Sequence, residues 1–88
     1  MLDLDSAWRL HPQVALRQEP FGALAYHFGN RRLSFLKTRK LVAVVEGLAD
    51  HESVRTALES ASVTRDEEAA YMSALERLAA GGIVVPRR

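Results

Sequence analysis

The chain of 88 residues contains no cysteine, which excludes a disulfide framework, a thiolate nucleophile and a cysteine-ligated metal site. It also lacks a long hydrophobic segment, since its longest apolar run, Leu41–Val45, is far too short to span a membrane. The N-terminus, MLDLDSAWRL, carries acids where a secretory signal requires a basic region. These absences predict a cytoplasmic protein that has no membrane partner.

Overall charge is small, but it is unevenly distributed. The net charge is +1, with seven Lys and Arg against four Asp and Glu in residues 1–49 and two against seven in residues 50–76. Five of the twelve basic residues lie within residues 31–40. A content of 48% hydrophobic and 26% charged residues is typical of a globular protein, and the length favours a single domain over residues 1–88.

The first half of the chain shows the alternation of strands. Residues 13–18, 23–28 and 31–36 each alternate between apolar and small or polar side chains. Gly29-Asn30 is a suitable two-residue hairpin loop, because both residues tolerate positive φ angles. These segments predict a sheet of three antiparallel strands.

The predicted turn also fixes the register of the hairpin. It places Tyr26 opposite Leu33 and Leu24 opposite Phe35, so one face is aromatic and aliphatic. We therefore expect Leu33 and Phe35 to lie in the core and Arg32 to lie on the other face.

The hydrophobic period then changes from 2 to 3.6, which predicts three helices. Thr38 is expected to cap the first, Gly47 to end it in the left-handed conformation, and Asp50 to cap the second. Thr64 and Glu67 form a capping box for the third. The expected buried stripe of that helix is Ala69, Met72, Leu75 and either Leu78 or Ala79.

The predicted order is three strands followed by three helices, an α+β fold of the winged helix-turn-helix type. Gly81-Gly82 ends the last helix, and Ile83–Val85 can add a short strand. Trp8 either caps the core or belongs to an apolar surface that makes the protein dimerise.

No group of residues predicts catalysis. The histidines His11, His27 and His51 are widely separated and are expected to be incidental surface or sheet-edge residues. No serine lies in a nucleophile elbow, and Gly81-Gly82 lacks the motif of a phosphate-binding loop. The sequence therefore predicts a protein that is not an enzyme and that holds no cofactor or metal.

Two kinds of binding remain open. A winged helix with a basic hairpin is compatible with DNA, although both later helices carry net negative charge that phosphates would repel. The third strand is also a sheet edge, to which an extended acidic peptide can add. The basic side chains beside it can equally serve only to protect that edge from aggregation. Alternation does not show whether Arg32, Ser34 and Leu36 or Arg31, Leu33 and Phe35 direct their backbone groups outward.

Two segments carry a resemblance to a known family. Residues 10–49, LHPQVALRQEPFGALAYHFGNRRLSFLKTRKLVAVVEGLA, contain a P-x-V-x-L opening strand, a hairpin and an apolar helix followed by glycine. Residues 71–85, YMSALERLAAGGIVV, contain a final helix of the form L-x-x-L-x-x-x-G with apolar residues after it. In these segments the chain resembles the PqqD-like peptide chaperones, or RiPP recognition elements, and among them those of the mycofactocin system.

The resemblance implies a domain that binds the acidic leader of the mycofactocin precursor peptide and presents it to a radical S-adenosylmethionine maturase. It implies that the leader adds as a strand to the third strand, against the third helix. The implied peptide-binding residues are Arg31, Arg32, Leu33, Ser34, Phe35, Leu36 and Lys37 on the strand, and Glu68, Tyr71, Met72 and Leu75 on the helix. Lys37-Thr38 stands where the family often has asparagine.

Overall fold

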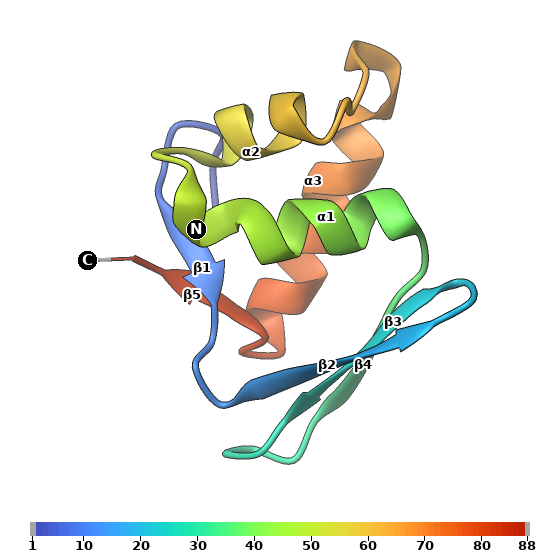
Figure 1. Ribbon diagram of the computed structural model, residues 1–88. Coiled ribbons are helices and arrows are strands. Elements are labelled where there is room, and N and C mark those ends of the chain that lie inside the picture. The colour runs from blue at the N-terminus through green and yellow to red at the C-terminus, as the bar shows by residue number, and fades with distance from the viewer. Residues whose placement is uncertain (1, 88) are drawn as a thin grey trace.

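The computed structural model describes residues 2–87 as an α+β fold (Figure 1). The elements are β1 (Trp8–Leu10), β2 (Val14–Glu19), β3 (Gly22–His27), β4 (Leu33–Leu36), α1 (Arg39–Gly47), a 3-10 turn η1 (Leu48–Asp50), α2 (Val54–Ser60), α3 (Arg65–Ala80) and β5 (Val84–Pro86). The expected antiparallel strands and three helices are confirmed. The order differs in detail, because β1 precedes the predicted strands. Across residues 2–87, the helices are too short or too polar to cross a membrane.

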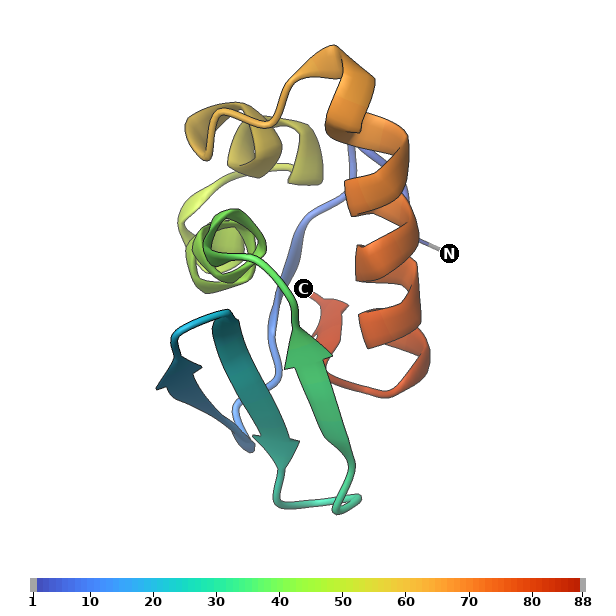
Figure 2. The same ribbon diagram turned by 90° about the vertical axis from the view of Figure 1, so that its right-hand side faces the viewer.

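The strands form two separate antiparallel sheets. One has the order β2-β3-β4, and the other pairs β1 with β5, the two ends of the chain. Helix α1 lies over one face of the three-stranded sheet, and α3 stands beside β4 (Figure 2). The geometry therefore leaves β4 as the sheet edge nearest to α3.

The predicted register of the hairpin is confirmed, but the predicted orientation of its faces is wrong. Tyr26 pairs with Leu33, and Leu24 pairs with Phe35. Leu33 and Phe35 are nevertheless 56% and 53% exposed. The side chains that pack toward the core are those on the opposite face, the small Ala23 and Ala25 together with Leu36. Small residues on that face leave room for the backbone of α1 to approach the sheet closely.

Gly22 permits the close crossing where β4 leads into α1. A Cβ atom at this position would collide with the carbonyl oxygen of Leu36 and would lie 3.1 Å from the Thr38 nitrogen. Thr38 caps α1, since its Oγ1 accepts a hydrogen bond of 3.0 Å from the Leu41 amide. A glycine at the start of β3 therefore fixes how the sheet edge joins the first helix.

The hairpin loop is longer than predicted. It comprises residues 28–31, because the His27 amide donates to the Arg32 carbonyl over 2.9 Å and the Arg31 amide to the His27 carbonyl over 2.7 Å. Among the loop's non-glycine residues the positive φ falls on Arg31, at 62°, and not on Asn30. The register survives because both loop lengths place the same residues opposite one another.

His27 corrects the expectation of an incidental surface histidine. It is 5% exposed, and its Nδ1 accepts hydrogen bonds from the amides of Gly29 and Asn30 over 2.9 and 3.1 Å. Its ring lies 4.3 Å from that of His11, centroid to centroid. His27 thus holds the loop of the hairpin in place.

We expect the His11 ring to make stability depend on pH. Burial first, then the nearby His27 and Arg9, lowers the pKa of His11 below the ordinary value of 6.5. The unfolded chain therefore binds a proton more readily than the folded protein does. The contribution of neutral His11 to the stability of the fold is therefore fully present above pH 6.5 and is lost as the pH drops below this value.

Denaturant unfolding between pH 7.5 and 5 measures this effect. His11→Asn should flatten the pH dependence, whereas His51→Asn, which leaves the histidine pair intact, should not. An unchanged slope in His11→Asn would contradict the assignment.

The helix caps agree with the sequence at two of three positions. Thr38 caps α1, and Thr64 with Glu67 forms the expected capping box of α3. The second helix is capped by Ser53 and not by Asp50, which lies within η1. Gly47 does not end α1 in the left-handed conformation; its φ is −87° and the chain continues into η1.

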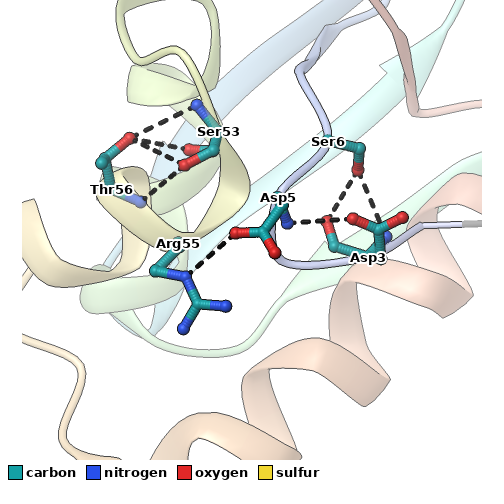
Figure 3. A network of polar contacts seen from close by, with 6 residues as sticks. All are labelled: Asp3, Asp5, Ser6, Ser53, Arg55 and Thr56. Atoms are coloured by element: carbon teal, nitrogen blue, oxygen red, sulfur yellow. Dashed lines mark hydrogen bonds and ion pairs between the residues drawn. The ribbon is translucent and has the colours of Figure 1, made fainter.

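Residues 5–8 and Arg87, near the two ends of the described chain, contact the helices or cap the core. Arg55 on α2 donates to Asp5 over 3.1 Å beside the Ser53–Thr56 cap (Figure 3), and Trp8 is buried with its Nε1 donating to Ser6. Near the C-terminus, the Arg87 guanidinium donates to the carbonyls of Leu48, Ala49 and His51. Trp8 therefore caps the core, and Arg87 satisfies carbonyl groups where the first helical segment ends.

Candidate peptide-binding groove

A groove runs between β4 and α3. Its lower part is a hollow of about 560 Å³, and its upper part is a pocket of about 220 Å³. Lys37 and Arg77 line both, so the two spaces adjoin. The remaining lining residues are Arg32, Leu33, Ser34, Phe35, Ala80 and Gly81 below, and Thr38, Leu41, Ala70, Tyr71 and Ala74 above.

The hydrogen-bond pattern shows which backbone groups of β4 face this groove. The Arg32 carbonyl accepts a hydrogen bond from the His27 amide, so these two residues form a hydrogen-bonded pair. Such pairs recur at every second residue of an antiparallel ladder, so Ser34 and Ala25 form the next one. The β2 side of the sheet agrees, because the amide of Phe28, directly after β3, donates to the carbonyl of Gln13, directly before β2, over 2.9 Å. By alternation, the N–H and C=O groups of Leu33 and Phe35 point away from the sheet, toward the free edge.

The side chains of β4 alternate between the two faces of the sheet. Leu33 and Phe35 project onto the sheet face away from α1, whereas Arg32 and Ser34 lie on the groove side. The Arg32 Cδ lies 3.7 Å from the position that a Cβ on Gly81 would occupy. Arg32 therefore lies against the end of α3.

The groove is cationic. Arg32, Lys37 and Arg77 line it, and no Asp or Glu is among its lining residues. The acids of α3 lie elsewhere: Glu67 is engaged by Lys40 at 2.8 Å. Hydrogen bonding to Lys40 and to the Thr64 amide lowers the pKa of Glu67, so it stays ionised within its own ion pair. Although α3 has net negative charge, it presents a cation to β4.

The upper pocket is lined by small and apolar side chains. Ala70 and Ala74 occupy successive turns of α3, and Leu41 contributes from α1. The Tyr71 hydroxyl lies 3.1 Å from Thr38 Oγ1, which links α3 to the cap of α1. This pocket has room for one medium-sized apolar side chain with cations at its margin.

Asn30 joins the hairpin to α3. Its Nδ2 donates to the Gly81 carbonyl over 3.0 Å, and its Oδ1 accepts from the Arg32 amide over 2.9 Å. Gly82, with φ of 77°, turns the chain away after the helix. Asn30 thus fixes the separation of β4 and α3 at the lower end of the groove.

The structure brings some of the expected site residues together and leaves others apart. Leu36 and Leu75 are completely buried, at 0% exposure, and Met72 packs against the core. Glu68 and Arg31 line neither part of the groove. The expected residues that line the groove are Arg32, Leu33, Ser34, Phe35, Lys37 and Tyr71.

Sequence reasoning missed the face of α3 that meets β4. Ala70, Ala74 and Arg77 line it, at spacings of four and three residues. This stripe lies directly beside the core stripe of Leu75 and Leu78. The sequence signal for this face was Ala70 and Ala74, four residues apart, followed three residues later by Arg77, next to the buried stripe.

Elsewhere in residues 2–87, the candidate sites are less suited to binding a peptide. They contain no group of three or more His, Asp or Glu side chains arranged to hold a metal ion. Two further hollows lie beside Pro20 and beside Trp8. Neither adjoins the free edge of β4, so the groove is the site best suited to an extended chain.

A free strand edge beside a cationic groove is the geometry of a domain that can accept an extended peptide. The chain belongs to the Peptide chaperone MftB family, whose model matches residues 7–85.

Its relatives in mycobacteria carry the name of this family. The chain is 56% identical to a Peptide chaperone MftB of Mycobacterium ulcerans, over 97% of its own length and 78% of the relative. It is 54% identical to the protein of that name from Mycobacterium tuberculosis, over 98% and 79%. For Mycolicibacterium smegmatis the identity is 56%, over 96% and 82%. No solved structure matches the chain.

Proposed function

We propose that this protein is a non-catalytic peptide chaperone that binds the acidic leader of the mycofactocin precursor peptide. It delivers the leader to a radical S-adenosylmethionine maturase in the cytoplasm. Residues 1–88 act as a single recognition domain with a winged helix-turn-helix arrangement. Membership of the Peptide chaperone MftB family supports the class of function, and the groove supports its mechanism.

The outward backbone groups of Leu33 and Phe35 carry this proposal. A leader strand beside β4 receives main-chain hydrogen bonds from these residues, which supply affinity without regard to sequence. Side chains of the leader that enter the groove meet Arg32, Lys37 and Arg77. These cations select an acidic segment, speed the encounter and help to fix the register.

Titration of the leader peptide tests the proposal. Isothermal calorimetry should show saturable binding, and amide chemical shifts in β4 and the groove face of α3 should move. The titration is repeated with the maturase present, where a ternary complex is expected. Absence of binding at high micromolar leader, with and without the maturase, would refute the proposal.

A bulky residue on the groove face of α3 should block the leader. Ala70 is exposed and lines the upper pocket, so Ala70→Trp fills space that the leader needs. We expect affinity to fall at least about tenfold, or about 1.4 kcal/mol. Ala69→Trp is the matched control, because Ala69 is exposed on the same helix but lines neither part of the groove. Equal losses in both variants would show that the groove is not the binding site.

The alternative, a DNA-binding winged helix, has little support. The first turn of α3 carries Asp66, Glu67 and Glu68, which would repel phosphates. A mobility-shift assay with duplex DNA at low salt distinguishes the two functions, because only the alternative requires binding there.

A further inference from the structure

The sheet face opposite α1 is uncovered in residues 2–87. It is apolar along β3 and β4, whereas β2 contributes Arg17, which lies opposite Leu24 and is ion-paired with Glu19 at 2.9 Å. We call the apolar part the outer face, and it comprises Phe21, Leu24, Tyr26, Phe28, Leu33 and Phe35. Four of these side chains are between 45% and 62% exposed. Grouped exposed aromatic residues of this kind usually mark an interaction surface.

The rings of the outer face are ordered by contacts among themselves. Phe21 and Phe35 meet edge to face, with centroids 6.3 Å apart, and Tyr26 and Phe28 do so at 5.0 Å. Phe21 lies before β3, yet it packs against a residue of β4. The ring of Phe35 is therefore supported from one side while its other side remains open.

Strand addition determines what must lie beside these residues. In a ladder, directly opposed residues project their side chains on the same face of the sheet. The outward backbone groups belong to Leu33 and Phe35, whose side chains lie on the outer face. Ligand residues opposite these two must therefore also project onto the outer face, while the ligand residue opposite Ser34 enters the groove.

We propose that the β4 margin of the outer face, formed by Leu33 and Phe35, is a second recognition surface, which selects apolar side chains at alternate positions of the acidic peptide. This inference rests on the proposed addition of a strand to β4. The ligand pattern is apolar at two positions separated by one residue, with an acidic residue between them directed toward Arg32 and Arg77. The chaperone thus recognises an alternation and not merely negative charge.

Serine variants of the outer face test this proposal. Leu33→Ser and Phe35→Ser should each weaken binding of the leader about tenfold. Phe28→Ser is the matched control, because Phe28 lies on the same face but directly after β3, two strand spacings from an added strand, or about 10 Å. The control should bind within about twofold of the wild type. Circular dichroism verifies that every variant is folded.

Two designed peptides give a second measurement. One alternates leucine and glutamate over eight residues, and the other contains the same residues as a leucine block and a glutamate block. The alternating peptide should bind at least about tenfold more tightly, and Phe35→Ser should remove most of that preference.

The outcomes separate the two proposals. If the leader binds the wild type and both serine variants equally, the outer face does not read the peptide, although strand addition stands. If the leader does not bind at all, the proposed function itself fails. If wild-type protein self-associates in sedimentation and Phe28→Ser abolishes this, a second copy covers the face and the inference is overturned.

Discussion

Replacing Phe35 with proline is expected to reduce leader affinity at least about fiftyfold while the protein stays folded. Proline removes the outward amide of residue 35, and its ring occupies the place of the paired strand. A lost hydrogen bond costs about 1 kcal/mol, and the lost aromatic contact and the steric conflict add to it. Edge strands tolerate proline where the missing N–H faces away from the sheet, so the fold should survive.

Two control variants separate the backbone from the side chain. Phe35→Ala removes the ring but keeps the amide, so it should lose only about tenfold in affinity. Ser34→Pro removes an amide of the Ser34–Ala25 pair inside the sheet and should lower the melting temperature. Calorimetry with the leader and thermal unfolding measure both effects. If Phe35→Pro binds like Phe35→Ala, the outward amide makes no bond to the leader.

The register of the hairpin could be predicted because two independent constraints agreed. Strand alternation and the position of Gly29-Asn30 both place the same residues opposite one another, such as Tyr26 opposite Leu33 and Leu24 opposite Phe35. The loop proved longer, with its positive φ at Arg31, but a loop lengthened by one residue on each side keeps the same pairs. The predicted register is therefore correct although the predicted type of turn is wrong.

The orientation of the sheet could not be obtained from hydrophobicity. The rule that bulky apolar residues face the core fails here because α1 packs on alanines, and Ala23 and Ala25 are fully buried. The bulky face is left exposed. A sheet with one small apolar face and one large apolar face offers two solutions of similar pattern, and only the packing of the helix decides between them.

Long-range pairing and helix rotation were the other gaps. The sheet of β1 and β5 joins residues at opposite ends of the chain, and Trp8–Leu10 is too short to show alternation. On α3, the capping box gave the helix start, and Leu75 and Leu78 were correctly expected to be buried, whereas Ala69, expected in the same stripe, is exposed. Which neighbouring stripe meets β4 depends on where the sheet lies, so Arg77 could not be assigned to the groove from its spacing.

Reversing the two groove arginines is the second test with a large expected effect. Arg32, directly before β4, and Arg77 on α3 approach the groove from its two sides, so Arg32→Glu with Arg77→Glu makes its lower part acidic. An exposed pair is worth about 0.5 kcal/mol, and reversal both removes an attraction and adds a repulsion. Two reversals should therefore cost about 2 kcal/mol, or about thirtyfold in leader affinity at low salt.

The control for this variant changes the net charge equally at other places. Arg39→Glu with Arg65→Glu puts the acids at the starts of α1 and α3, where the helix dipole favours them and the groove is not involved. This control should bind the leader within about threefold of the wild type. Calorimetry at low and high salt compares them, and the loss in the groove variant should shrink as screening increases. Equal losses in the two variants would mean that overall charge, and not the groove between β4 and α3, attracts the leader.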